Sequence, residues 1–165
     1  MVAPVSFSVS TSEQMQAFGK QIGALLTAGD VVVLSGPLGA GKTTFVQGLA
    51  EELDVQGPVT SPTFVVSRVH KPKSTGLALV HVDAYRLSSQ SDLVDLDLDA
   101  TKNAAFVIEW GKEFVSGFTE NWLEIDIDRA QELSDVTDPA SGIRTVSVTA
   151  VGDRWKDLDL ARPNA

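Results

Sequence analysis

VVVLSGPLGAGKTTFVQGLA, from Val31 to Ala50, is the stretch of this sequence that decides the fold. Its aliphatic start is typical of a strand that a parallel sheet buries on both faces. A glycine-rich segment follows, and apolar residues then recur at helical spacing as far as Leu53. We therefore expect a strand over Val31–Ser35, a loop over 36–41 and a helix over Lys42–Leu53.

The glycine-rich segment GPLGAGKT, from Gly36 to Thr43, matches the pattern G-x-x-x-x-G-K-[ST] of loops that bind nucleoside triphosphates. Glycines let the backbone amides approach an anion, and the following helix points its positive end at the same place. Lys42 adds a mobile cation for the β- and γ-phosphates, and the Thr43 hydroxyl can ligate Mg²⁺. The residues expected to contact the nucleotide are Leu38, Gly39, Ala40, Gly41, Lys42, Thr43 and Thr44.

Two acidic residues close apolar runs further along the chain. Asp83 ends the run in LALVHVDAYRL, and Glu109 ends the run in AAFVIEWGKEF. If both runs are strands, both acids lie at the carboxyl edge of the sheet, which faces the phosphate-binding loop. A charge there is costly without a partner, and Mg²⁺ with its waters would be that partner. We therefore predict metal-binding and catalytic roles for both acids, with Lys42 as the third catalytic residue; a solvated strand end is the alternative for each acid.

The segment VTSPTF, from Val59 to Phe64, is a candidate sensor of the γ-phosphate, because it follows the helix after the phosphate-binding loop. Ser61 and Thr63 offer hydroxyls to Mg²⁺ or to phosphate, and Pro62 stiffens the segment. A plain helix-to-strand turn would use serine and proline equally well. The residues alone leave both interpretations open.

The remaining pattern predicts further helices and strands. Ser10 and Glu13 have the spacing of a capping box before a helix that stops near Gly29. WLEIDID and Ile143–Ala150 alternate apolar and polar residues, so they would pair as an antiparallel hairpin. Other strands are expected over Phe64–Val69, Leu77–Val82 and Ala104–Ile108, and short helices within SSQSDLVDLDLDA and over Lys112–Phe118. Together these elements predict an α/β three-layer sandwich around a mostly parallel, mixed sheet.

Composition limits the function further. The 165 residues fit one domain, which we expect to span 1–165 with a frayed tail from about 158 to 165. The chain has no cysteine, which excludes disulfides and thiolate zinc sites and suits the cytoplasm. It has no basic signal region and no apolar run long enough for a bilayer. The net charge of -9, with 13 scattered Lys and Arg, argues against direct binding of RNA or DNA.

SGPLGAGKTTFVQGLA, GPVTSPTFVV, HVDAYRL and VIEWG follow one another in this order on a short chain. In this combination the sequence resembles the TsaE (YjeE) family, bacterial P-loop ATPases required for making N6-threonylcarbamoyladenosine in tRNA. The match runs from about Ser10 to Trp110 and continues faintly into GDRW, Gly152 to Trp155. The resemblance implies a P-loop NTPase-type fold that binds ATP and Mg²⁺ and, alone, hydrolyses ATP slowly.

The resemblance also implies partners and residue roles. The protein would dock on a TsaD–TsaB type complex, the threonylcarbamoyl-transferring subunit with its inactive paralogue, and would reach tRNA only indirectly. ATP hydrolysis would reset that complex between rounds of tRNA modification. Glu109 matches the family's Walker B-like acid and Asp83 its other essential acid; which of them orients the attacking water stays open. Trp110 matches the tryptophan after the acid, as a packing or a ligand-contacting residue. Ser12 falls where the family places its adenine pocket, and Tyr85 and Arg86 match as well.

Three other functions share the phosphate-binding loop. A small phosphotransferase usually clamps phosphates with a cluster of arginines, whereas the six arginines here are scattered. A GTP-dependent switch would carry N-K-x-D for the guanine edge, and TKNA at 101–104 does not match it. A nucleotide-gated module that binds a protein, with incidental hydrolysis, would suit the acidic charge.

Overall fold

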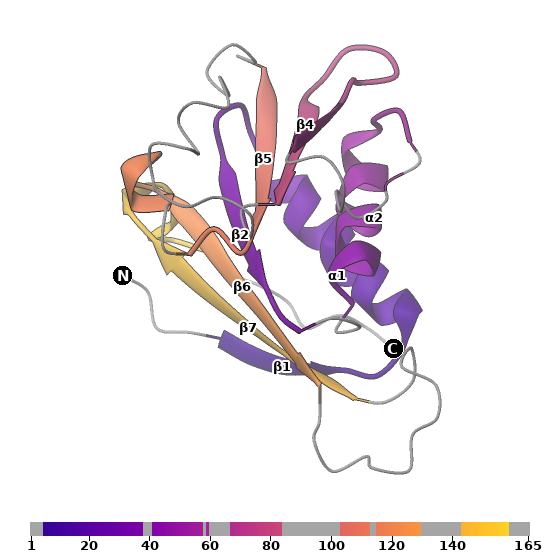
Figure 1. The fold of residues 1–165 in the computed structure, drawn as a ribbon, viewed down its shortest axis with the longest axis vertical. Coiled ribbons are helices and arrows are strands. Elements are labelled where there is room, and N and C mark those ends of the chain that lie inside the picture. Colours follow the sequence, from indigo (N-terminus) through magenta and orange to yellow (C-terminus); the bar gives the residue numbers. More distant parts are fainter. Residues whose placement is uncertain are drawn as a thin grey trace.

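The computed structural model describes residues 5–37, 41–57, 59, 67–83, 103–112, 115–129 and 143–158. In these residues seven strands form one sheet in the order β1-β7-β6-β2-β5-β4-β3. The elements are β1 (Val5–Val9), α1 (Ser12–Leu25), β2 (Val31–Ser35), α2 (Lys42–Leu53), β3 (Ser67–His70), β4 (Ala78–Asp83), β5 (Ala104–Glu109), η3 (Val115–Gly117), β6 (Trp122–Arg129), β7 (Arg144–Val151) and η4 (Asp153–Trp155). Figure 1 shows both α-helices gathered at one side of the sheet. None of the described helices is long and apolar enough to span a bilayer.

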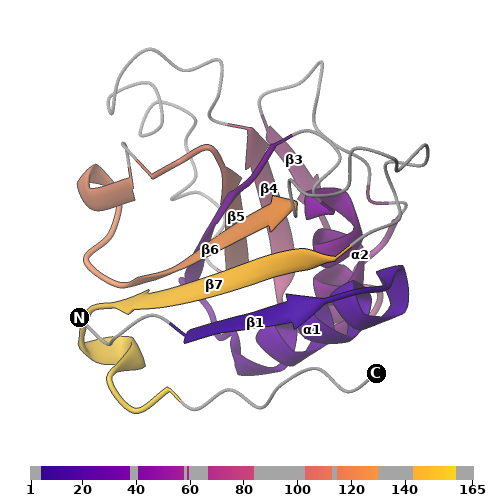
Figure 2. The same cartoon turned by 90° about the horizontal axis from the view of Figure 1, so that it is seen from below.

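Parallel pairing occupies the centre of the sheet. β2 pairs in parallel with β5 on one side and β6 on the other, and β5 pairs in parallel with β4. The flanks are antiparallel, because β3 joins β4, β7 joins β6 and β1 joins β7 in that sense. The predicted α/β class, the mixed sheet and the antiparallel C-terminal hairpin are confirmed. Figure 2 shows that hairpin, β6 and β7, with β1 at its outer edge.

β1 is a strand that the sequence analysis did not predict. Its residues VSFSV alternate, with Phe7 and Val9 buried and Ser6 and Ser8 exposed. The alternation is that of a strand with one wet face, but it lasts only five residues. Pairing with β7, where Phe7 lies opposite Val146, is what completes it. The strand therefore depends on a partner far along the chain, which the local pattern does not reveal.

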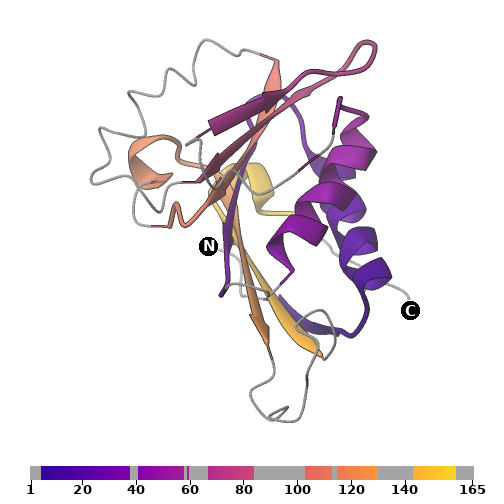
Figure 3. The ribbon, with the colours of Figure 1, turned by 45° about the vertical axis from the view of Figure 1, so that its right-hand side comes forward.

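The two faces of the sheet are covered differently. α1 and α2 lie together on one face, as Figure 3 shows, and the larger apolar core lies between them and the sheet. On the other face a smaller core surrounds Phe106 and Ile108. There the ring of Phe118, just after η3, meets the ring of Phe106 edge-on at 5.5 Å between centroids. In the described part of the chain, the α-helical layer thus lies on one face only.

The start of α1 is shifted by one residue from the prediction. Thr11, not Ser10, is the N-cap: its Oγ1 accepts a hydrogen bond from the Gln14 backbone N–H at 3.1 Å. Gln14 Oε1 in turn accepts hydrogen bonds from the backbone N–H and the hydroxyl of Ser10, at 2.7 and 2.9 Å. Thr11 and Gln14 have the same capping-box spacing as Ser10 and Glu13. Both pairs therefore fit the capping-box pattern, and the pattern alone could not show which residue is the N-cap.

The motif GDRW ties the end of the described chain to the start of β2. The Arg154 guanidinium donates to both carboxylate oxygens of Asp30, at 3.2 and 3.0 Å, and to the Leu25 carbonyl at 3.0 Å. Its Cζ also lies over the ring of Trp155, 4.0 Å from the ring centroid. A bidentate arginine–carboxylate pair fixes geometry as well as supplying energy. It therefore anchors the turn between α1 and β2, just before the strand that leads to the glycine-rich loop.

The backbones of α1 and α2 touch at glycines. A β-carbon at Gly48 would lie 2.1 Å from the Gln16 carbonyl oxygen, and one at Gly19 would lie 2.1 Å from the Phe45 carbonyl oxygen. Neither carbonyl can move without disturbing its helix. The close approach also lets Phe18 meet Phe45, with ring centroids 5.3 Å apart. The position of α2 on the sheet is thus set by its contact with α1.

We predict that Gly48→Ala lowers the free energy of unfolding by roughly 1–3 kcal/mol, because the added methyl group forces the helices apart. This loss would appear although alanine favours a helix over glycine by about 1 kcal/mol. Gly57→Ala is the matched control, since a β-carbon there meets its nearest atom at 3.5 Å, an ordinary contact. Urea unfolding of both variants measures the difference. A Gly48→Ala protein as stable as the control would contradict the close contact.

Candidate functional site

The register of the central strands brings the candidate residues to one edge of the sheet. β4 and β5 pair so that Asp83 lies opposite Glu109. β5 and β2 pair so that Glu109 lies opposite Leu34, one residue before β2 ends. The Trp110 backbone N–H donates to the Leu34 carbonyl at 3.1 Å and extends this pairing by one residue. The two acids and the start of the glycine-rich loop are therefore neighbours at the carboxyl edge.

Both acids share the face of the sheet that α1 and α2 cover. Leu79 on β4 and Val107 on β5 belong to the core beneath the helices. Because side chains two residues apart along a strand point to the same face, Asp83 and Glu109 point there too. Lys42 opens α2 at this edge. The edge therefore combines a helix N-terminus, a lysine and two carboxylates.

Lys42 is a half-buried cation with several partners. Its Nζ donates to the carbonyl oxygens of Gly36 and Pro37, the latter at 3.3 Å, and lies 5.0 Å from the centre of the Trp110 ring. Burial holds the pKa of Lys42 below its usual value, while the charges of Glu109 and Asp83 act in the opposite direction. The ammonium group is thus poised over the first residues of the loop, within the electrostatic reach of both acids.

The first turn of α2 offers backbone donors. Its N-cap, Gly41, has the left-handed φ of 108°, which favours glycine, and no side chain of the described residues caps the helix. The first amides of a helix lack intrahelical partners, and those of Thr43 and Thr44 belong to this turn. No acidic residue stands in the first turn to repel an anion. Leu38, Gly39 and Ala40, predicted to bind nucleotide, lie outside the described residues, as do Ser61 and Thr63.

Glu109 has a buried partner that the sequence analysis missed. His81 Nε2 lies 2.5 Å from Glu109 Oε2, and the two side chains are 0% and 6% exposed. His81 stands two residues before Asp83 on β4 and shares its face of the sheet. The position of His81 in HVDAYRL, two residues before Asp83, could have indicated that the two side chains share a face of the sheet. Its pairing with a glutamate 28 residues away, however, depends on the register of two strands.

Trp110 follows Glu109 in an unusual backbone conformation. Its φ of 61° lies in the left-handed region, which for a bulky side chain carries strain of about 1–3 kcal/mol. The residue is 39% exposed, so it is not part of the core. Its ring instead lies near the ammonium of Lys42. This exposure argues against packing in the core, whereas packing at the rim and contact with a ligand both stay predictions.

Ser12 begins α1 near Gly41, the residue that precedes α2. It is exposed, and one turn later the Met15 side chain packs near Gly41, with its Cε 3.3 Å from where a β-carbon of Gly41 would stand. The start of α1 therefore borders the loop. No contact of Ser12 itself in the described residues bears on an adenine pocket.

The donors at the edge fit Mg²⁺ by their chemistry. Mg²⁺ prefers oxygen ligands and is usually held by one or two carboxylates together with substrate phosphates. Asp83, Glu109 and the Thr43 hydroxyl provide such oxygens. Among the described residues, no group of three or more His, Cys, Asp or Glu side chains lies close enough to hold a metal ion by itself. Tyr85 and Arg86, which follow Asp83, lie outside the described residues.

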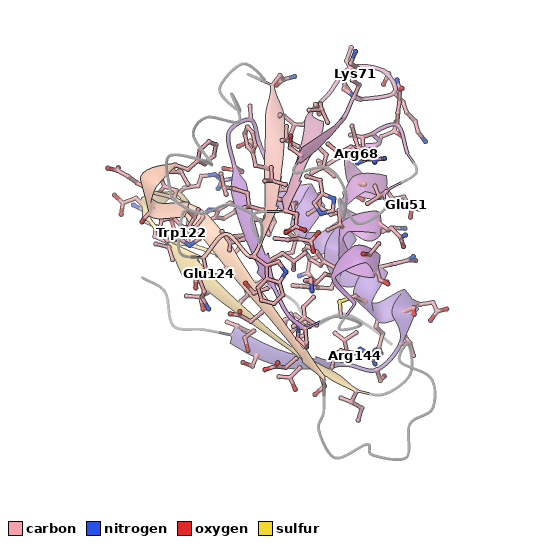
Figure 4. The ribbon with its side chains drawn as sticks, in the orientation of Figure 1. Glu51, Arg68, Lys71, Trp122, Glu124 and Arg144 are labelled. Carbon is pink, nitrogen blue, oxygen red and sulfur yellow. The ribbon has the colours of Figure 1, made fainter. Side chains whose placement is uncertain are left out.

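The opposite face of the sheet carries its own charged residues beside this edge. Asp126 on β6 lies opposite Ser35, the last residue of β2, and pairs with Lys112 at 3.3 Å. Trp122 Nε1 donates to Glu124 Oε1 at 3.1 Å on the same strand. Figure 4 shows Trp122 and Glu124 on β6, well away from Arg68 and Lys71 at β3. Trp122, Glu124 and Asp126 thus lie on the face of the sheet opposite to that of Glu109.

Comparison with known proteins gives one consistent relationship. The family model described as "Threonylcarbamoyl adenosine biosynthesis protein TsaE" matches residues 9–136. The tRNA threonylcarbamoyladenosine biosynthesis protein TsaE of Streptomyces coelicolor is 50% identical over 149 residues, which are 89% of this chain and 97% of that protein. The protein of the same name from Bacillus subtilis is 34% identical over 146 residues, covering 88% of this chain and 85% of its own.

A solved structure agrees with the sequence relatives. The crystal structure of YdiB from Bacillus subtilis superposes with a TM-score of 0.71 at 30% identity, and the superposition covers 94% of this chain and 91% of that one. The family model covers well over half of the chain. The chain therefore belongs to the TsaE family of threonylcarbamoyladenosine biosynthesis proteins.

Proposed function

We propose that this protein is a Mg²⁺-dependent ATP-binding protein and slow ATPase, which acts with the threonylcarbamoyl-transferase complex in forming N6-threonylcarbamoyladenosine in tRNA. The observation that carries the proposal is the register of β4, β5 and β2. It sets Asp83 and Glu109 side by side at the edge where the glycine-rich loop and α2 begin. Membership of the TsaE family supports the role in the tRNA pathway, and the residues gathered at this edge support the proposed ATP chemistry.

Binding of the triphosphate would use the loop amides, the first turn of α2 and Lys42. The helix N-terminus favours negative charge, and its uncapped amides can donate to phosphate oxygens. Lys42 would exchange the carbonyls of Gly36 and Pro37 for the β- and γ-phosphates. Its ammonium is already desolvated in part, which strengthens its attraction to a phosphate.

Hydrolysis would depend on the two carboxylates. Bound Mg²⁺ would neutralise charge that develops on the phosphates. The Thr43 hydroxyl, Asp83 and Glu109 would hold it directly or through its waters, and one of the two acids would orient the attacking water. Glu109 is the more enclosed of the two, since it is 4% exposed and bonded to His81. Its carboxylate is thus fixed before any nucleotide arrives.

The acidic charge supports a role through protein partners. A net charge of -9 repels a tRNA backbone, so we assign contact with tRNA to the partners. We propose that these are the threonylcarbamoyl-transferring subunit and its paralogue. ATP turnover would then act on an assembly and not on a small substrate, in the reducing cytoplasm that a chain without cysteine suits.

Lys42→Ala is expected to abolish ATP binding, because it removes the ammonium that lies over the Gly36 and Pro37 carbonyls at the start of the loop. Isothermal titration with ATP and Mg²⁺ measures the loss. Lys20→Ala is the control: Lys20 lies on α1 and pairs with Glu51 at 3.1 Å on the surface of the helices. Full ATP affinity in Lys42→Ala would refute the assignment of the loop.

Glu109→Gln is expected to leave ATP binding nearly unchanged and to lower kcat for ATP hydrolysis by about 100-fold or more, the usual effect of removing one charge-stabilising group. Glutamine keeps the shape of the side chain and an oxygen that can accept from His81. Phosphate release under saturating ATP and Mg²⁺ gives kcat. Asp126→Asn is the matched control, because that carboxylate lies at the same edge but on the other face of the sheet. Normal turnover in Glu109→Gln would reject its role.

The partner proposal predicts faster ATP turnover when the purified transferase subunit and its paralogue are added together. The reason is that a docked partner would exclude water from the proposed site at the carboxyl edge of the sheet. The same addition to Glu109→Gln should give no increase. Unchanged turnover of the wild-type protein with both subunits present would speak against this partner.

A further inference from the structure

His81 is a fully buried polar side chain on β4, the strand between β5 and the edge strand β3. It lies on β4 opposite Val107, and Asp83 lies opposite Glu109 two residues later. The side chains of all four residues therefore share one face, and His81 reaches diagonally across to the Glu109 carboxylate at 2.5 Å. The exposed fraction of His81 is 0%. Such a ring cannot swing away without opening the core.

The two ring nitrogens of His81 have different surroundings. A carboxylate only accepts hydrogen bonds, so Nε2 carries the hydrogen that points to Glu109. Nδ1 is buried with no hydrogen-bond partner in the described part of the chain. A hydrogen on Nδ1 would therefore lack an acceptor, which buried polar groups rarely tolerate. The surroundings select the tautomer with its hydrogen on Nε2.

The other histidine of the chain shows the opposite arrangement. His70 Nδ1 lies 3.0 Å from the Gln56 carbonyl oxygen, so His70 donates from Nδ1. Burial lowers the pKa of His70, which favours the neutral ring. The chain thus contains two histidines whose surroundings select different tautomers.

The hydrogen bond to His81 restricts the flexible side chain of Glu109 at the carboxyl edge of the sheet. A glutamate has three rotatable side-chain bonds, whereas the His81 ring is locked by its burial. One oxygen, Oε2, is held at the ring, so Oε1 is the oxygen left to accept from a water of the proposed site. The backbone beyond Glu109 is fixed as well, because Trp110 bonds to Leu34. Outer hydrogen bonds of this kind commonly orient reactive carboxylates.

We propose that His81 is a positioning residue for ATP hydrolysis, which holds the Glu109 carboxylate in its working orientation through the Nε2 hydrogen. The inference rests on the proposed ATPase function. It assigns His81 no contact with the nucleotide or the metal. It predicts that the donor atom, more than the imidazole ring, is what turnover requires.

Two variants separate the donor from the ring. In His81→Gln the amide nitrogen can reach the place of Nε2, whereas in His81→Asn it reaches only the place of Nδ1. Both changes replace the ring by an amide. In the full chain with Mg²⁺ and ATP, we expect His81→Asn to lose about 10–100-fold in kcat, the usual effect of removing an orienting hydrogen bond, and His81→Gln to recover most of it. The Kd for ATP should change little in either.

Three results distinguish the possible failures. Equal turnover of His81→Asn and the wild-type protein would overturn the proposal, as would equal losses in both variants at similar unfolding midpoints. Loss of ATP affinity in parallel with kcat would mean a general structural role and would overturn it too. The proposed function fails separately, if the wild-type protein shows no ATP turnover or if Glu109→Gln turns over normally.

Nuclear magnetic resonance tests the same bond without changing His81, and it decides if the two variants do not fold. Long-range ¹H–¹⁵N spectra of protein labelled at histidine show which ring nitrogen carries hydrogen. With only two histidines, a His70→Gln sample assigns both signals. We expect hydrogen on Nε2 of His81 and on Nδ1 of His70. A neutral His81 with its hydrogen on Nδ1 would overturn the proposal.

Discussion

The parallel register of β4, β5 and β2 is the constraint on which the site depends. It places Asp83 opposite Glu109, and Glu109 opposite Leu34 at the end of the strand that enters the loop. A slip of β5 by one residue would turn Glu109 to the other face of the sheet. It would then lose His81 and move away from Lys42. The chemistry of the edge is therefore a consequence of strand pairing and not of any local motif.

Apolar patterning alone does not fix that register. β5 is buried along its whole length, and so is β4 up to Val82. Strands buried on both faces show no alternation that penalises a slip. The hydrogen bond between His81 and Glu109 does penalise it, since a slip would leave two buried polar groups unpaired. The same bond can thus specify the pairing of the strands and orient the acid, which links the folding of the sheet to its function.

The sequence predicted the parts of the fold whose signals are local. The strand Val31–Ser35, the helix Lys42–Leu53 and the alternating C-terminal hairpin were predicted because each pattern lies within one segment. β1 was missed because its short alternation is completed only by β7. His81 was missed for the same reason, since its partner is set by register. The one-residue error at Thr11 arose where two capping patterns overlapped.

The contacts of Lys42 connect the packing of the helices to the candidate site. Its ammonium is held by the carbonyls of Gly36 and Pro37 and by the face of Trp110. A triphosphate bound as we propose would have to displace those partners, so its affinity would reflect the difference between two sets of contacts and not the strength of one. The position of Lys42 follows from α2, and α2 is fixed by the contact between Gly48 and α1. The packing of α2 against α1 therefore sets the position of the ammonium that we propose binds the phosphates.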